Sequence, residues 1–423
     1  MIHACLLATC LMAQAPPASG NMSTQVAQFV RQLDANEKSQ RDAAEQGLVE
    51  LGPAVLDVLP DSDAVTSAEM RLRLKRIRSQ LELAAARSTS RASTITLGGT
   101  GLSLEDVIKA VTEQTGNKIV DYRSQFGEPQ RAVKLNLALN KVPFWQGIDQ
   151  ILDSGGLTIY NFGSENALAL VSRPLSQVPR FDAANYVGAF RLAVTDVSSH
   201  VNLREPGRRK LQLNIEVAWE PRLKPVILTL DGSRLAGRDD IGKALKLEAA
   251  GRQIELNINS GATVVELPIE LELPPREARK IASLSGVLEA VLPGRVEEFR
   301  FDELAAAKKV QQRRGGVEVT LDEARKNQSL WEMRVRVSFA DAGQALESHR
   351  AWVFNNEAWV ETPQGEKLEF SGMETTMQTD REVGVAYLFD VPGGLDGCKF
   401  VYRTPSAILK TPIAFELRDL ELP

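Results

Sequence analysis

The sequence is poor in the residues that build metal sites and disulfide scaffolds. Its 423 residues include only three His and three Cys. A zinc site needs three or four such ligands close together, and a disulfide framework needs paired Cys. We therefore expect no metal site, no bound cofactor and no disulfide scaffold.

Charge of one sign and long apolar runs are also missing. Lys and Arg number 50 against 55 Asp and Glu, a net charge of −5, so no strong field would attract nucleic acid or an anionic membrane. No apolar run reaches the roughly 20 residues of a membrane-spanning helix, so we expect no integral membrane segment in the mature chain. The content of 43% hydrophobic and 25% charged residues is that of an ordinary globular protein, and the length suggests two to four domains.

The first fifteen residues have the pattern of an export signal. A short apolar run from Ala4 to Ala13 precedes Ala13-Gln14-Ala15, the small-x-small pattern at which signal peptidase cleaves. The run has no Lys or Arg before it, and the alternatives are a buried helix or a lipoprotein signal that would use Cys10. We predict a signal peptide over residues 1–15 and a periplasmic or otherwise extracytoplasmic mature protein.

Residues 22–88 have helical periodicity. The spacing of Arg41, Ala44, Leu48, Leu51 and Gly52 resembles one HEAT-type helical hairpin, and Gly52-Pro53 is a stop signal. The last helix of this segment carries a basic run at residues 71–78. An acidic partner or lipid headgroups are one interpretation of that run, and a solvated helix face is the favoured one.

Residues 94–172 predict a β-α-β-β-α-β-β order. Ser103 is a candidate N-cap, Gly116 a left-handed C-cap, and Gly155-Gly156 the end of a second helix that begins at Pro143. Trp145, Ile148 and Leu152 share a face of this second helix and are expected in the core.

This segment resembles the short N-terminal domain of secretins and TonB-dependent receptors. The match rests on residues 102–108 (LSLEDVI), 114–120 (QTGNKIV), 133–137 (VKLNL), 142–152 (VPFWQGIDQIL) and 156–160 (GLTIY). The resemblance implies a small α+β protein-docking domain of the cell envelope, without catalytic residues.

Alternating strands dominate the remainder of the chain. Residues 211–217, 254–258, 265–273 and 331–339 alternate apolar and polar side chains, which is typical of antiparallel sheets with one wet face. Pro268 favours an edge strand, and Pro274-Pro275 a boundary. We predict two antiparallel β-sandwich domains, at 180–274 and 275–423. The second resembles a module of planctomycete-type exported envelope proteins, through residues 347–358 (ESHRAWVFNNEA) and 401–405 (VYRTP).

Motifs with possible chemistry are weak. Gly99-Thr100-Gly101 lacks the third glycine of a dinucleotide fingerprint, and a turn is favoured. A calcium loop at Asp231, Asp239 and Asp240 is less favoured than a polar hairpin. His200 and His349 lie in different predicted domains without a nucleophile motif, so we expect no catalytic residues and no enzyme. The cations at 308–314 are expected at a helix end, where they face the negative end of the dipole, rather than in a nucleic-acid patch.

One aromatic cluster is a candidate contact for a ligand or partner. His349 lies close in sequence to Trp352 and Trp359, and the two indoles would suit a sugar-stacking platform. Core and cross-strand packing is the favoured alternative.

Taken together, these patterns predict a multidomain chain with α+β and all-β parts. They favour an exported protein that docks or scaffolds other envelope proteins. A carbohydrate-binding or carbohydrate-processing protein is the alternative.

Overall fold

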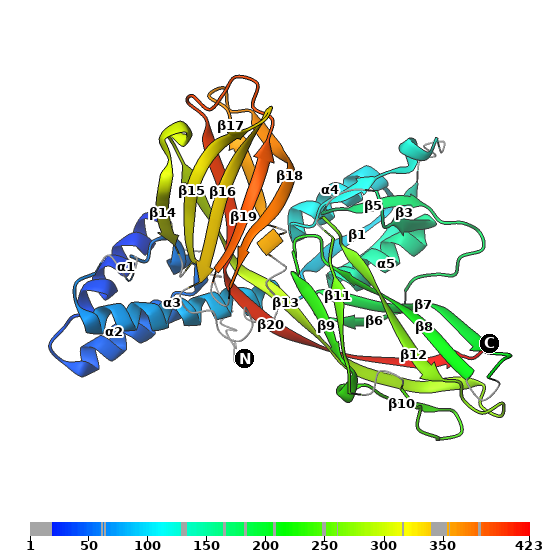
Figure 1. The fold of residues 1–423 in the computed structure, drawn as a ribbon. Coiled ribbons are helices and arrows are strands. Elements are labelled where there is room, and N and C mark those ends of the chain that lie inside the picture. The colour runs from blue at the N-terminus through cyan, green and yellow to red at the C-terminus, as the bar shows by residue number, and fades with distance from the viewer. Residues whose placement is uncertain are drawn as a thin grey trace, which may run out of the picture. The chain divides into compact units, whose positions relative to one another are not determined.

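The computed structural model describes residues 19–423 with short gaps. The gaps are residues 61, 63–64, 128–132, 164–165, 182–183, 206–208, 248–250, 260, 315–316, 340–352, 355 and 380–381. The chain divides into two compact units, residues 1–85 and 86–423. The described residues form five α-helices and mostly antiparallel sheets, so the prediction of a mixed helical and strand-rich chain is confirmed (Figure 1).

The first unit is helical where the structure describes it. Its elements are α1 (Ser19–Gln32), α2 (Lys38–Glu50), a 3-10 turn (Pro53–Asp57) and α3 (Ala68–Thr89), which extends past the end of the unit. The core contains Leu33, Leu48, Ile77 and Leu81, of which Ile77 and Leu81 lie four residues apart on α3, at helical spacing. Gly52 has a φ of +84° and ends the turn after α2 directly before Pro53, so the predicted stop signal is confirmed.

The second unit begins with the predicted α+β segment. Its elements follow in the predicted order: β1 (Thr94–Ser103), α4 (Leu104–Thr115), β2 (Ile119–Asp121), a 3-10 turn (Arg123–Phe126), β3 (Lys134–Pro143), α5 (Phe144–Gly155), β4 (Leu157–Tyr160) and β5 (Leu168–Ser172). Ser103 accepts a hydrogen bond from the Asp106 N–H, and Gly116 and Gly156 are left-handed C-caps, as predicted. Pro143 differs, because it is the N-cap of α5 and not its first helical residue.

We call residues 94–172 the α+β module. Its strands form an antiparallel β1–β3 pair and a three-stranded sheet in the order β2-β5-β4, in which β2 is parallel to β5. Helices α4 and α5 bury one face each against these strands, and Trp145 lies in the shared core. Gly99-Thr100-Gly101 is not a turn. It belongs to β1, where the pairing with β3 shifts register.

A second core lies between two sheets. One sheet has the order β12-β8-β7-β6, and β12 is an edge strand, as Pro268 predicts. The other sheet contributes β9, β10, β11 and parts of β13 and β20. The strands are β6 (Asn185–Val187), β7 (Phe190–Val201), β8 (Arg209–Trp219), β9 (Ile227–Asp231), β10 (Ala236–Asp239), β11 (Gln253–Asn257), β12 (Val264–Glu272), β13 (Lys280–Phe301) and β20 (Lys399–Glu421).

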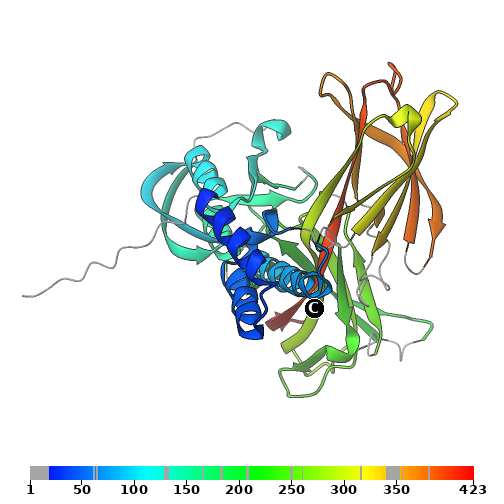
Figure 2. The ribbon, with the colours of Figure 1, turned by 90° about the vertical axis from the view of Figure 1, so that its left-hand side faces the viewer.

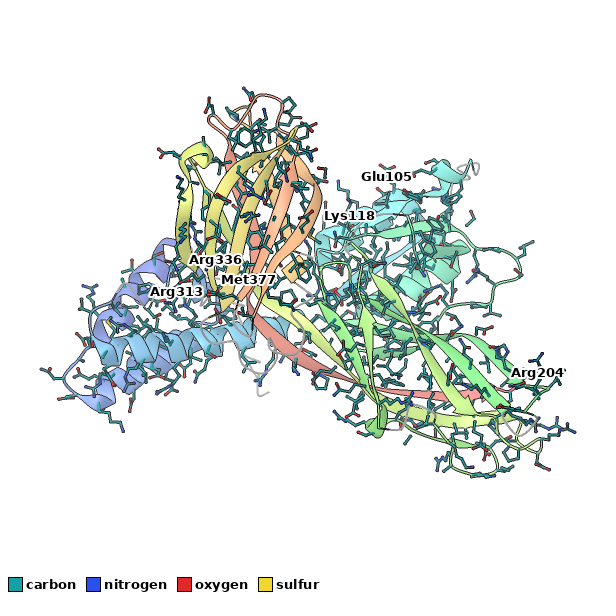
Figure 3. All side chains as sticks on the ribbon, in the orientation of Figure 1. Glu105, Lys118, Arg204, Arg313, Arg336 and Met377 are labelled. Carbon is teal, nitrogen blue, oxygen red and sulfur yellow. The ribbon has the colours of Figure 1, made fainter. Side chains whose placement is uncertain are left out.

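A third core lies inside a nearly closed eight-stranded sheet. Its order is β13-β20-β17-β18-β19-β16-β15-β14, and Gln312 of β14 donates to the Arg300 carbonyl of β13 at 2.6 Å. The added strands are β14 (Lys308–Arg314), β15 (Val317–Asn327), β16 (Leu330–Phe339), β17 (Glu357–Glu361), β18 (Lys367–Gln378) and β19 (Glu382–Phe389). Figure 3 shows Arg313 on β14 and Arg336 on β16 of this sheet.

Two long strands connect these cores. β13 and β20 pair antiparallel from Lys280–Glu421 to Phe301–Phe400 and lie side by side in both views (Figures 1 and 2). Leu288 and Phe415 belong to the core between the two sheets, whereas Phe299 and Phe400 belong to the third core. The two cores share β13 and β20. Residues 274/275, the boundary that the sequence predicts, therefore do not separate them.

The expected helix end at residues 308–314 is wrong. This segment is strand β14, which pairs antiparallel with β15. Its cations lie on the terminal strand of the hydrogen-bonded sheet order, where charged side chains oppose pairing with another chain.

Candidate functional site

Four aromatic rings gather at one end of the three-stranded sheet of the α+β module. Tyr122 follows β2, Phe126 ends the 3-10 turn, Tyr160 ends β4, and Phe162 lies two residues further on. β2 and β4 flank β5, so Val120 and Tyr160 both pair with Ala169. This pairing brings together two aromatic pairs that lie almost 40 residues apart in the sequence. We call these four residues the aromatic cluster.

The rings contact one another at aromatic-pair distances. The centroids of Phe126 and Tyr160 are 4.9 Å apart and edge-to-face, and those of Tyr160 and Phe162 are 5.8 Å apart. Tyr122 and Tyr160 stack with centroids 6.3 Å apart. Such pairs hold their rings in defined orientations, because the face and edge of a ring carry opposite partial charges.

The outer rings of this cluster are open to solvent. Phe126 is 51% exposed and Phe162 is 89% exposed. A single exposed apolar side chain is common on a protein surface, but contiguous exposed aromatic surface is typical of a contact site. The cluster offers rigid apolar area, and the Tyr hydroxyls add polar groups at its edge.

Packing leaves little space beneath the cluster. A Cβ built at Gly163 would lie 2.6 Å from the Ala169 Cβ and 2.9 Å from the Tyr160 ring. Only glycine allows the chain after Phe162 to pass this close to the sheet. The position of the rings therefore follows from the sheet pairing and from the lack of a side chain at residue 163.

A buried ion-pair network joins the α+β module to the β7–β8 sheet. The Asp149 carboxylate, on α5, is fully buried. It accepts hydrogen bonds from Arg191 Nε at 2.7 Å, Arg180 Nε at 3.1 Å and the Tyr186 hydroxyl at 2.7 Å. Glu216 of β8 lies 3.2 Å from Arg191 and 3.6 Å from Arg180, which balances two cations with two anions.

A second buried carboxylate joins the start of the module to the end of β8. Glu220 is fully buried and accepts from the Ser93 N–H and hydroxyl, from Asn117 Nδ2 at 2.9 Å and from Arg222 Nε at 2.6 Å. The donors to Asp149 all come from outside the module, whereas Glu220 has donors from both sides of the junction. The module is thereby held in a fixed orientation on the sheet, which supports a contact surface of defined geometry.

Only part of the predicted tryptophan platform lies within the residues that the structure describes. His349 and Trp352 lie outside the described residues. Trp359 is on β17 and is 9% exposed, and Lys367 Nζ lies 4.6 Å from its ring centroid. One face of this indole therefore contacts a cation.

The acidic loop residues act as local caps. Asp231 accepts from the Ser233 N–H and hydroxyl, Asp239 accepts from the Lys243 N–H, and Asp240 accepts from the Arg279 N–H. His200 is exposed on β7 opposite Lys210.

The basic run on α3 is largely used inside its own unit. Arg73 is 7% exposed and pairs with Asp42 at 2.9 Å, Glu45 at 2.6 Å and Glu69 at 2.8 Å. Arg71 donates to the Val65 carbonyl, Arg76 pairs with Glu45, and Arg78 donates to the Leu59 and Pro60 carbonyls. The sequence favours a solvated helix face for this run. These arginines instead tie α3 to the segments packed against it.

Sequence reasoning missed the aromatic cluster and the buried carboxylates. Phe126 and Phe162 each precede a glycine in a polar loop, which was the available signal for exposed rings. Asp149 lies four residues after Trp145 and three before Leu152, so it shares the apolar face of α5. A carboxylate on that face signals a buried ion pair.

Within the described part of the chain, no helix is both long and apolar enough to cross a membrane. No known protein family, curated protein or solved structure matches the chain.

Proposed function

We propose that the α+β module docks an extended apolar segment of another protein and that the aromatic cluster is its contact surface. The observation that carries this proposal is the exposure of Phe126 and Phe162 within a set of four mutually packed rings. Exposed apolar rings fixed by packing lose little conformational entropy on binding, so they are effective anchors.

The strand beside the rings favours an extended partner. β4 pairs with β5 on one side and is an edge of the three-stranded sheet. A segment that adds to this edge forms main-chain hydrogen bonds and passes Tyr160, at the end of β4. Main-chain pairing supplies affinity, and the rings select apolar side chains.

The wider proposal is an exported scaffold of the cell envelope. It rests on the signal-like residues 1–15 and on the resemblance of residues 94–172 to the secretin and TonB-receptor short domain. The HEAT-like interpretation of residues 22–88 belongs to the same proposal. We expect no catalytic turnover, because no sequence motif pairs a nucleophile with a base.

Site-specific photo-crosslinking tests the docking proposal. The full chain would carry a photoreactive phenylalanine analogue in place of Phe162, in cells of the source organism. Leu203 offers a matched control position, because it is 87% exposed and lies on the β7–β8 loop, outside the α+β module. We expect a protein adduct from position 162, mapped to an apolar extended segment of the partner, and none from position 203.

A synthetic peptide of the mapped segment then gives the affinity. We expect Phe126→Ala in the full chain to weaken peptide binding about thirtyfold, as loss of an anchor side chain does, and Leu203→Ala to leave it unchanged. Equal binding by all three proteins would refute the proposal. An adduct with glycan and not protein at position 162 would favour the carbohydrate alternative.

A further inference from the structure

A cavity of about 290 Å³ lies where three parts of the second unit meet. Asn166 reaches it from the β4–β5 loop, Asn259 from the β11–β12 loop, and Asn356 from the start of β17. The Asn166 N–H donates to the Gly261 carbonyl at 2.8 Å, which fixes the module loop against the wall of the cavity. We call this space the junction cavity.

Carboxamides with unused hydrogen-bonding groups line this cavity. Within the described structure, the side chains of Asn166 and Asn259 make no hydrogen bond. Asn356 is 8% exposed, and its side-chain bonds run from Nδ2 to the Tyr402 hydroxyl at 2.8 Å and to Thr404 Oγ1 at 3.0 Å. Asn166 and Asn259 each offer donors and an acceptor, and Asn356 offers its Oδ1 acceptor, so the set matches a ligand whose groups both donate and accept.

The charges around the cavity are balanced. Glu357 lies between Lys224 Nζ at 3.0 Å and Arg403 Nη1 at 3.0 Å, and Glu298 lies 3.7 Å from Arg403 Nε. Burial raises the pKa of Glu357, but the hydrogen bond and charge of Lys224 and the charge of Arg403 outweigh it, so the pKa is lowered and the carboxylate is ionised at neutral pH. Lys224, Glu357 and Arg403 line the cavity, and Glu298 lies beside them and also pairs with Arg300. Each charged side chain of the lining therefore has a partner of opposite charge, and none is left unpaired to bind an ion.

Apolar side chains form the rest of the wall. Pro225, Val226, Ile258, Pro293 and Pro405 line the cavity beside the polar groups. Its volume is near the lower end of the range for ligand pockets, about 300 Å³, so it suits one small molecule and not a folded chain.

We propose that the junction cavity binds a small neutral polyhydroxylated ligand, the size of one sugar residue. The hydroxyls of such a ligand donate and accept at once, as the carboxamides and the Lys224–Glu357–Arg403 group require. Its C–H faces pack on the proline-lined wall. This site is separate from the aromatic cluster, so either proposal can fail without the other.

Binding of neutral sugars to the full chain tests this proposal. Glucose and N-acetylglucosamine serve as probes in saturation-transfer NMR and calorimetry, with glucuronate as the anionic counterpart. The test variant is Asn166→Gly with Asn259→Ala; glycine is chosen because Asn166 has a φ of +51°, which strains alanine. Asn140→Ala is the control, because Asn140 is an exposed asparagine on β3.

We expect saturable binding of at least one neutral sugar, weakened about tenfold or more in the double variant, which loses two hydrogen-bonding side chains, and unchanged in Asn140→Ala. Binding that survives the double variant would place the sugar elsewhere and overturn the proposal. The proposal also fails if neither neutral sugar binds, or if only glucuronate binds with an affinity that falls as salt is added.

Discussion

Trp145 is held by packing and by one hydrogen bond. It is 2% exposed on α5, and its indole Nε1 donates to the Ala189 carbonyl at 3.1 Å, between β6 and β7. Phe144 packs edge-to-face on its ring, with centroids 5.5 Å apart. The side chain therefore contributes to the module core and to the attachment of the module.

We expect Trp145→Ala to lower the free energy of unfolding of the full chain by about 3–5 kcal/mol. The truncation leaves a cavity in a packed core and removes one of the two donors to the Ala189 carbonyl, the other being the Glu220 N–H. Urea unfolding followed by circular dichroism measures the change, and the exposed Phe162→Ala is the control, with an expected change below about 0.5 kcal/mol. Equal midpoints for Trp145→Ala and the unsubstituted chain would contradict the assigned burial.

Cys398 is buried, as its alternation with Phe400 and Tyr402 predicts. The thiol is 4% exposed, and burial together with the charge of Asp396 raises its pKa. A raised pKa leaves less of the reactive thiolate at neutral pH. We expect slow labelling by a maleimide in the folded state. Labelling should be rapid once the chain is unfolded in about 6 M guanidinium. Rapid labelling at Cys398 in the folded chain, located by mass spectrometry of its peptides, would show that this thiol is reachable.

At the scale of elements, local signals predicted the module well. Ser103, Gly116 and Gly156 act within one helical turn of their own positions, so capping could be predicted without knowledge of the fold. The alternation of residues 265–273 likewise predicted β12, because one face of that strand is buried and the other is exposed.

Elements whose structure depends on distant partners were not predicted. Residues 308–314 have no clean alternation, and they are a strand because β15 pairs with them. The sharing of β13 and β20 between two cores follows from a pairing that joins residues that lie 99 to 141 positions apart, from Phe301–Phe400 to Lys280–Glu421. The aromatic cluster depends in the same way on the β2-β5-β4 pairing.

The ion-pair ladder on β15 and β16 gives an expected acid dependence. Glu332 accepts from Arg334 at 2.6 Å and from Arg325 at 3.0 Å; burial raises its pKa, but these arginines outweigh it, so the pKa is lowered. A lowered folded-state pKa contributes stability above the unfolded-state value of about 4.3, and this stability is lost as the pH falls through the folded-state value.

We therefore expect Glu332→Gln to cost about 1–2 kcal/mol at pH 7, a modest amount because both arginines are partly exposed. When the pH is lowered from about 5 to about 3, the variant should lose less stability than the unsubstituted chain. Urea midpoints across this range measure the difference. Parallel pH profiles would show that Glu332 does not contribute to the acid limb.

At the scale of the whole molecule, the α+β module depends on the sheet that follows it in sequence. Asp149 has its donors at Arg180, Tyr186 and Arg191, all outside residues 94–172. Trp145 and Asn117 also bond to residues of the later strands and loops. A fragment of residues 90–176 would lose all of these partners, which is why the docking experiment uses the full chain.

The stability cost of Asp149→Asn is expected to depend on whether the rest of the chain is present. In the full chain, Asp149→Asn leaves Arg180 and Arg191 with Glu216 as their one counter-charge among the described residues, and we expect a loss of about 3 kcal/mol, as for a broken buried ion pair. In the 90–176 fragment the covering sheet is gone and residue 149 faces water, so the same substitution should change stability by less than about 0.5 kcal/mol. Urea unfolding of both pairs of proteins measures the two differences. Equal costs in both contexts would mean that Asp149 stabilises the module from within and that the network does not hold it on the sheet.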